Sequence, residues 1–285
     1  MSFFIPFIIG GILSFGFFFW AKSIKVKAAF FFLTSSLLIA AMFSLVTDNV
    51  EARIWNTFKK SNLLNSEEKT KNEAVKIVKI KEQVLLSAPV FKQNPELPRG
   101  CEVTALAMLL QYKGIKVDKM ELAEKVKKDT TPLVEKDGSV FWGNPNDGFI
   151  GNMYTKSKPG YGVYHKPIKE LAEQYLPGQV VDLTGKSFTE LETYLSSGVP
   201  VWVITNTTFR KLPDSAFETW DTPQGKVKIT YKEHAVIITG YDQKTVYFND
   251  SISGTKNMAI PKQDFIAAWK QMGSQAVTYL PNSVQ

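Results

Sequence analysis

Two apolar segments at the start of the chain limit most strongly what this sequence can fold into. Residues 2–20 contain no charged side chain, and neither do residues 28–46. About 20 apolar residues in a helix are enough to cross the hydrocarbon core of a bilayer. Only the short stretch 21–27 separates the two segments, so the chain must turn back tightly between them. The sequence therefore predicts a two-helix transmembrane hairpin over residues 1–46, with the lipid bilayer as its partner.

The loop of this hairpin is basic, because Lys22, Lys25 and Lys27 all lie in it. Short loops rich in lysine remain on the cytoplasmic side of a membrane. Both ends of the hairpin then lie outside, which predicts a two-span cell-membrane protein with an extracytoplasmic C-terminal domain. Basic residues between positions 53 and 60 act against this orientation. A cleaved signal peptide and a buried pair of core helices are the alternative interpretations of the two segments.

The remainder of the chain divides into a polar stalk and a globular domain. Residues 47–83 are rich in charge and contain neither glycine nor proline, which is typical of a spacer, whereas residues 84–285 carry the apolar periodicity of a folded domain. Helical spacing and capping signals predict helices at 101–112, 120–128 with Asp118 as N-cap, 166–175, 191–195 after a capping box at Ser187 and Glu190, and 261–272. Extended apolar runs predict strands at 199–205, 226–230, 234–241 and 244–250, the last two joined by a two-residue turn at Asp242-Gln243. Helices followed by strands indicate an α+β domain with a mostly antiparallel sheet.

Composition excludes several classes of function. The chain has one cysteine, so it cannot be a disulfide scaffold. With one cysteine and two histidines it also lacks the ligands for a zinc site of several Cys and His residues. The net charge of +7 is spread along the sequence, so nucleic acid is not an expected partner. We expect neither a metal nor an organic cofactor.

Cys101 is the first candidate for catalysis. It follows Pro98 and Gly100 and begins an amphipathic helical segment, which places it in the first turn of a helix. The unpaired N–H groups and the dipole at that end favour an anion, so we expect a lowered thiol pKa and a reactive thiolate. The alternative is a small buried apolar side chain, the usual role of an unpaired cysteine.

His234 and Asp250 are candidates to support that thiol. His234 begins an apolar strand, and Asp250 ends the next one. A two-residue turn between the strands would put Asp250 opposite residue 235, close enough to orient the imidazole. Asn249 would then point to the other face of the sheet. The alternatives are a core-edge histidine and an aspartate that belongs to a turn.

Gln93 and two further features are weaker candidates. Gln93 lies in a loop eight residues before Cys101, and its amide could donate to an oxyanion. His165 precedes a predicted helix, where a solvated residue is the simpler interpretation. The glycine- and asparagine-rich loop 141–154 could line a cleft beside Cys101 or form a packed loop.

These residues lie in blocks that resemble one family. The segments QNPELPRGCEVTALAMLLQYKG, GNPNDGFIGNMY, GYGVYHKPI and EHAVIITGYD with VYFND are similar to the bacterial papain-fold cysteine peptidases related to the bacteriocin-leader-processing peptidases. The resemblance covers residues 84–280. It implies a papain-like fold, with Cys101 as nucleophile, His234 as base, Asp250 as the residue that orients it and Gln93 as oxyanion donor. Where the family often has Asp-Pro, this chain has Asp250-Ser251, which leaves Asn249 as the substitute.

The expected function is therefore that of a membrane-anchored cysteine peptidase acting on a peptide or protein substrate. Hydrolysis would pass through a thioester on Cys101. One alternative is a catalytically inactive peptidase fold that serves as a binding module at the membrane. The other is a cysteine amidase or transpeptidase that acts on cell-wall peptides.

Overall fold

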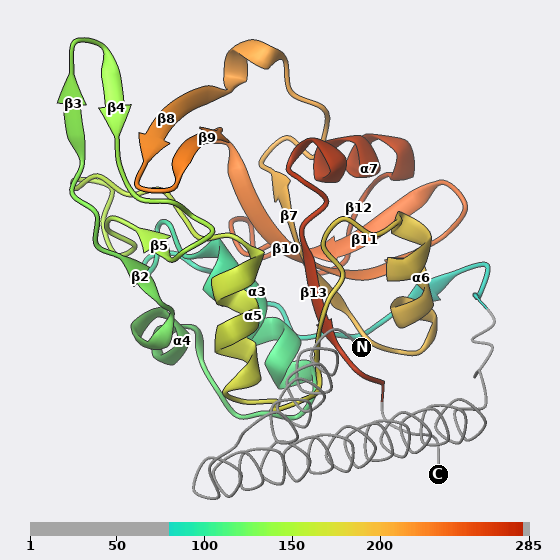
Figure 1. Cartoon of the computed structure of the whole chain (residues 1–285). Coiled ribbons are helices and arrows are strands. Elements are labelled where there is room, and N and C mark those ends of the chain that lie inside the picture. Colours follow the sequence, from blue (N-terminus) through green and yellow to red (C-terminus); the bar gives the residue numbers. More distant parts are fainter. Residues whose placement is uncertain (1–79, 282–285) are drawn as a thin grey trace, which may run out of the picture. The chain divides into compact units, whose positions relative to one another are not determined.

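An antiparallel sheet organises residues 80–281, the part of the chain that the computed structural model describes. The predicted hairpin 1–46 and most of the predicted stalk 47–83 lie outside these residues. Within residues 80–281, no helix has both the length and the apolar character needed to cross a membrane. The α+β class is confirmed, with the sheet at the centre and helices on both of its faces (Figure 1).

The helices are α3 (Cys101–Tyr112), α4 (Lys119–Lys125), α5 (His165–Glu173), α6 (Phe188–Ser196) and α7 (Lys262–Gln271), with a 3-10 turn η1 (Asp214–Ala216). The main sheet contains β1 (Val84–Leu85), β6 (Val180–Asp182), β7 (Val201–Asn206), β10 (Glu233–Tyr241), β11 (Thr245–Asn249), β12 (Met258–Pro261) and β13 (Ala276–Tyr279). Its order is β12-β11-β10-β7-β13-β6, and β1 pairs with the end of β10. All of its strand pairs are antiparallel.

The two central strands alternate between two apolar clusters. On β7, Trp202 and Ile204 belong to the cluster that contains α3, α4 and α5, whereas Val201 and Val203 belong to the cluster that contains α6 and α7. The same alternation continues along β10. A strand presents successive side chains to opposite faces, so a continuous apolar run is the pattern of a sheet covered on both sides. This packing holds α3 against β10, which places the start of the helix beside the start of the strand (Figure 1).

Local capping signals are confirmed. The Asp118 carboxylate accepts from the backbone N–H groups of Met120 and Glu121 at the start of α4. Ser187 and Glu190 form the reciprocal capping box at the start of α6. Both motifs satisfy N–H groups that have no partner within the helix, so they can be recognised from sequence alone.

The predicted two-residue turn at Asp242-Gln243 is wrong. Three residues separate β10 from β11, and Tyr241 lies opposite Val246 instead of residue 244. The Asp242 carboxylate accepts from the N–H groups of Lys244 and Thr245, which stabilises the longer loop. A register shift between Ile238 and Gly240 then brings Ile237 opposite Asn249. The longer loop and the register shift change the pairing in opposite directions and nearly cancel. Asp250, the residue after β11, therefore still lies beside the start of β10.

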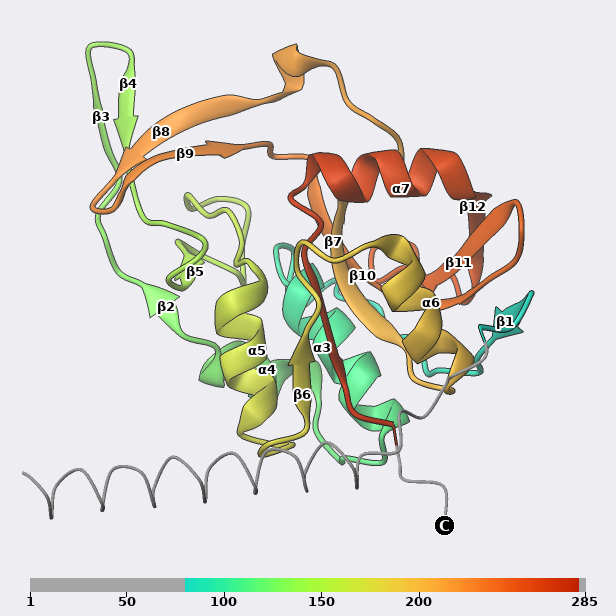
Figure 2. The ribbon, with the colours of Figure 1, turned by 45° about the vertical axis from the view of Figure 1, so that its right-hand side comes forward.

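A second sheet was not anticipated. It contains β3 (Val134–Lys136), β4 (Ser139–Phe141), β8 (Glu218–Thr222) and β9 (Gly225–Ile229), of which the sequence predicted only the last. The β3–β4 hairpin stands out from the body of the domain (Figure 2). β4 pairs with β8, and β8 pairs with β9. A separate parallel pair joins β2 (Lys128–Asp129) to β5 (Phe149–Ile150). Most of these strands are short and polar, so they lack a period-2 apolar pattern.

Candidate active site

Cys101 is the first residue of α3, as the sequence predicted. Gly100 precedes it as the N-cap residue, and a Cβ there would lie 2.6 Å from Cβ of the buried Leu97. The absence of a side chain therefore lets the loop close onto the helix. The helix behind Cys101 is almost entirely buried, which anchors the thiol at the end of a rigid element.

His234 lies near the start of β10 and pairs with Asp250. Nε2 of the imidazole is 2.7 Å from Oδ1 of the carboxylate, and His234 is completely buried. Asp250 also accepts from the backbone N–H groups of Ile252 and Ser253 and from the Ser253 hydroxyl. Burial opposes ionisation, but the bonds from His234 and Ser253 hold the pKa of Asp250 well below its usual range. The carboxylate can therefore stay charged and fix the ring.

Asn249 has a different position. Its amide donates to the backbone carbonyls of Ala88 (3.2 Å) and Pro89 (2.8 Å), and its oxygen accepts from the N–H of Asn257. Its hydrogen bonds therefore tie β11 to the segment before β12 and to the loop that follows β1. Asp250, rather than Asn249, is the residue bonded to the histidine.

Gln93 reaches the same region, but its amide is already engaged. Nε2 donates to the carbonyls of Leu97 and Pro98, both at 3.2 Å, while Oε1 accepts from the Ser251 hydroxyl at 2.8 Å. Both bonds from Nε2 are long. To donate to an oxyanion, the amide would therefore have to give up its hydrogen bonds to the carbonyls of Leu97 and Pro98 in the loop before Cys101.

One cavity brings three of the four predicted residues together. Its volume is about 190 Å³. It is lined by Gln93, Pro98, Arg99, Cys101, Lys156, Gly160, Tyr161, Thr207, Tyr231, Glu233, His234 and Ile252. Asp250 does not line the cavity and reaches it through the imidazole of His234. Among the residues that the structure describes, Nδ1 of His234 is buried and has no hydrogen-bond partner.

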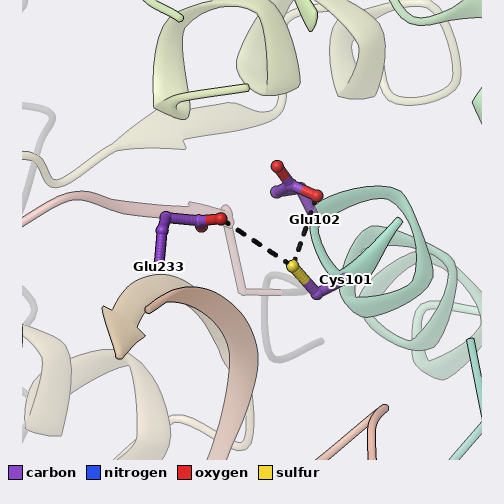
Figure 3. A group of neighbouring side chains, drawn as sticks. All are labelled: Cys101, Glu102 and Glu233. Atoms are coloured by element: carbon purple, nitrogen blue, oxygen red, sulfur yellow. Dashed lines mark hydrogen bonds between the residues drawn. The ribbon is translucent and has the colours of Figure 1, made fainter. Parts of the chain in front are cut away.

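Two glutamates beside the thiol were missed at the sequence level (Figure 3). Sγ of Cys101 donates to Oε2 of Glu102 at 3.3 Å and lies 4.0 Å from Oε2 of Glu233. Glu102 is completely buried, and its other oxygen accepts from the N–H of Val163 at 2.7 Å. Within residues 80–281, Oε1 of Glu233 has no partner. In this arrangement the sulfur is therefore hydrogen-bonded to a carboxyl group and not to the imidazole.

Gly162 makes room for this carboxyl pair. A Cβ on Gly162 would lie 2.4 Å from Oε1 of Glu102 and 3.2 Å from Oε2 of Glu233. Any side chain at this position would therefore displace at least one of the carboxyl groups. The segment around residue 162 thus closes directly over the acidic pair.

The pair changes the electrostatics expected of the site. Burial raises the pKa of Glu102 to about 7, and burial together with the charge of Glu102 raises the pKa of Glu233 well above its usual value. The expected lowering of the thiol pKa does not occur here. Burial, followed by the charges of both glutamates, raises the pKa of Cys101 well above that of a free thiol. These effects outweigh the helix N-terminus, which contributes only a partial charge.

The same three side chains could in principle hold a cation. One donor atom from each of Cys101, Glu102 and Glu233 lies within 4.8 Å of the others. Because burial favours the protonated form of all three groups, protons can also balance the cluster. A thiolate with two carboxylates suits a borderline metal such as zinc.

The remaining candidates lie elsewhere. His165 is the first residue of α5, and its Nδ1 is 2.9 Å from Oδ2 of Asp182. It does not line the cavity. No residue of loop 141–154 lines it either. The loop packs inward, with Trp142 buried and the carbonyl of Gly143 accepting from Nε1 of Trp220. The loop therefore packs away from this cavity, while its Trp142 lines an adjoining one.

Comparison with known proteins gives consistent matches. The Peptidase C39-like family profile matches residues 85–277. The uncharacterized protein YvpB of Bacillus subtilis (strain 168) is 50% identical over 183 residues, which is 64% of this chain and 70% of that protein. A crystal structure of a Bacillus anthracis protein assigned as a C39-like peptidase superposes with a TM-score of 0.66 at 51% identity. It covers 72% of this chain and 100% of its own.

Proposed function

The chain belongs to the Peptidase C39-like family, and from this premise we propose that it is a cysteine peptidase in which Cys101, His234 and Asp250 act together. One observation carries the proposal. The bond between Nε2 of His234 and Asp250 leaves Nδ1 unpartnered and buried, and the histidine lines the same cavity as the thiol. An imidazole oriented in this way can accept a proton at Nδ1.

The proposed reaction begins with a turn of the Cys101 sulfur from Glu102 toward His234. Nδ1 takes the thiol proton, and the thiolate attacks the carbonyl carbon of a peptide bond. The backbone N–H of Cys101 and the Gln93 amide stabilise the oxyanion. The imidazolium then returns its proton to the leaving amine, which leaves a thioester. A water molecule, deprotonated by His234, hydrolyses the thioester and restores the thiol.

The glutamate pair has a defined part in this scheme. A thiolate next to two ionised carboxylates would be strongly disfavoured, because like charges at this distance in a buried site repel. We therefore expect Glu102 and Glu233 to retain at least one proton when the thiolate forms. Neither residue touches the scissile bond in this scheme, so both are positioning residues.

The test is alkylation of Cys101 by iodoacetamide together with cleavage of a peptide library. Cys101→Ala should abolish both labelling and cleavage. His234→Ala should slow labelling at pH 7 and remove cleavage, because the base is lost, whereas His165→Ala serves as the matched control with little effect. If Cys101→Ala cleaves as well as the wild type, the proposal is wrong.

A binding module without activity is the second candidate, because the thiol is hydrogen-bonded to Glu102 and its pKa is raised. In that case the wild type and His234→Ala would be labelled equally slowly at neutral pH. Peptide binding without cleavage in the folded wild type would complete this assignment.

We further propose that residues 1–46 anchor the peptidase in the cell membrane with its catalytic domain outside. The support is the apolar character of the two segments and the three lysines between them. A reporter fused after Gln285 tests the orientation. Reporter activity on the cytoplasmic side would reverse it.

A further inference from the structure

A second, larger cavity adjoins the one that contains Cys101. Its volume is about 480 Å³, within the range of sites for small ligands. It shares Arg99, Gly160 and Tyr231 with the smaller cavity, so the two cavities lie on either side of these residues. Its other walls come mainly from the second sheet, which stands out beside the body of the domain (Figure 2). A substrate held by its carbonyl at Cys101 could therefore extend into this space.

A row of aromatic rings connects the two cavities. Trp142 and Trp220 have ring centroids 5.5 Å apart, and Tyr161 lies 5.3 Å from Trp220 and 5.9 Å from Tyr231. Nε1 of Trp220 donates to the carbonyl of Gly143, which fixes that ring. Trp142 and Trp220 are nearly buried, whereas Tyr231 is 64% exposed. Tyr231 therefore offers an accessible ring at the junction of the two cavities.

Two glutamates from different strands also line the larger cavity. Glu135 belongs to β3 and Glu218 to β8, and both are exposed. Within residues 80–281, neither carboxylate has a hydrogen bond or an ion pair. By contrast, Asp221 on the same β8 strand is paired with Lys226.

The charges of Glu135 and Glu218 act on Tyr231, at the junction of the two cavities. Burial, followed by the charges of Glu218 and Glu135, raises the pKa of Tyr231, and the charge of Arg99 opposes them. The guanidinium of Arg99 is held by the backbone carbonyls of Asn152, Thr155 and Lys156 and pairs with neither glutamate. Among the described residues, the two carboxylates of the larger cavity therefore have no ion-pair partner, and they lie beside aromatic walls.

We propose that this cavity binds a cationic amino-acid side chain of the substrate, with an aliphatic stem along Tyr231 and an ammonium or guanidinium group between Glu135 and Glu218. The inference rests on the proposed peptidase function and adds a substrate class to it. An apolar stem against an aromatic ring and a charge between two carboxylates is the chemistry of lysine, arginine or a diamino acid. Such residues occur both in proteins and in cell-wall stem peptides.

Binding to the full-length Cys101→Ala protein tests the proposal without turnover. The probes are two blocked tripeptides, acetyl-Ala-Lys-Ala-amide and its norleucine counterpart, which keeps most of the stem and lacks the charge. Calorimetry should give about tenfold tighter binding of the lysine peptide, a difference that falls as salt screens the exposed carboxylates. Equal binding of the two peptides would overturn the proposal.

Substitutions in the same background locate the preference. Glu135→Gln with Glu218→Gln should remove the difference between the peptides, and Glu135→Lys with Glu218→Lys should favour acetyl-Ala-Glu-Ala-amide instead. The matched control is Glu124→Gln with Glu170→Gln, which changes the net charge equally at exposed positions outside the cavity. A loss of preference in this control as well would assign the effect to net charge and overturn the site.

The two proposals fail separately. If the lysine peptide binds selectively but wild-type protein cleaves no lysine-containing peptide, the peptidase function is wrong and the cationic site stands. If the wild type cleaves lysine and norleucine peptides equally well, the cationic site is wrong and the peptidase function stands. Comparison of the linear lysine peptide with a stem peptide that contains diaminopimelate then distinguishes a protein from a cell-wall substrate.

Discussion

Glu102 shows how a single residue can set the chemistry of its neighbour. It is adjacent in sequence to Cys101, completely buried, and bonded both to the sulfur and to the Val163 N–H. A buried carboxylate at this distance raises the thiol pKa, so it opposes the activation that a helix N-terminus would otherwise give. The residue therefore holds the thiol in a protonated resting arrangement.

Replacement of Glu102 by glutamine tests this role. Glu102→Gln keeps the shape and removes the charge, so the thiol pKa should fall and alkylation at pH 7 should accelerate. The measurement is the rate of iodoacetamide labelling against pH, with the exposed Glu124→Gln as control. An unchanged or upward-shifted profile would contradict the electrostatic role of Glu102.

At the scale of elements, the site depends on the contact between α3, the start of β10 and the segment around Gly162. Each element is stable for its own reasons: α3 buries most of its length, and β10 lies in the middle of the sheet. The segment at Gly162 is different, because its position depends on the lack of a side chain above Glu102 and Glu233. This segment is therefore sensitive to a small change in volume.

Gly162→Ala should therefore disturb the site and the stability together. The added Cβ would overlap Glu102, and overpacking of this kind costs about 1–3 kcal/mol. Urea unfolding should show the loss, and the alkylation profile of Cys101 should shift because the carboxyl group is displaced. Wild-type values for both would show that the segment can move away without cost.

At the scale of the whole molecule, the buried acids link stability to pH. The pKa of Glu102 is about 7 in the folded chain, against 4.5 for the free group. Because the folded state holds a proton that the unfolded state releases, the stability that Glu102 contributes is fully present below pH 4.5 and is lost as the pH rises through 7. Glu233 adds to the same trend, whereas Asp250, whose pKa is lowered from 3.8, acts in the opposite direction and loses its contribution as the pH falls below that value.

Urea unfolding at pH 5 and pH 8 measures this linkage. The wild type should lose about 2–3 kcal/mol between these values on account of Glu102, and less if the folded site relaxes to admit water. Glu102→Gln should lose clearly less, since it has no proton to release at this position. Parallel curves for the two proteins would mean that Glu102 is ionised in the folded state.

Local signals were enough to predict much of this molecule. The start of α3 at Cys101, the caps at Asp118 and Ser187, and the apolar runs of β7 and β10 depend on neighbours within a few residues, so their patterns are visible in the sequence. Cys101, His234 and Asp250 each stand at the end of an element that local patterns indicate, but those patterns do not show that the three residues meet. The resemblance to cysteine peptidases added their proposed roles.

Other features depend on residues that are far apart in the chain. Glu102 and Glu233 are separated by 131 positions, and nothing near either of them indicates that both are buried beside one sulfur. The bulge in β10 and the second sheet likewise depend on which strands pair. Side-chain packing between distant segments sets burial, and burial sets the pKa values, so the protonation state of the site could be known only from the folded chain.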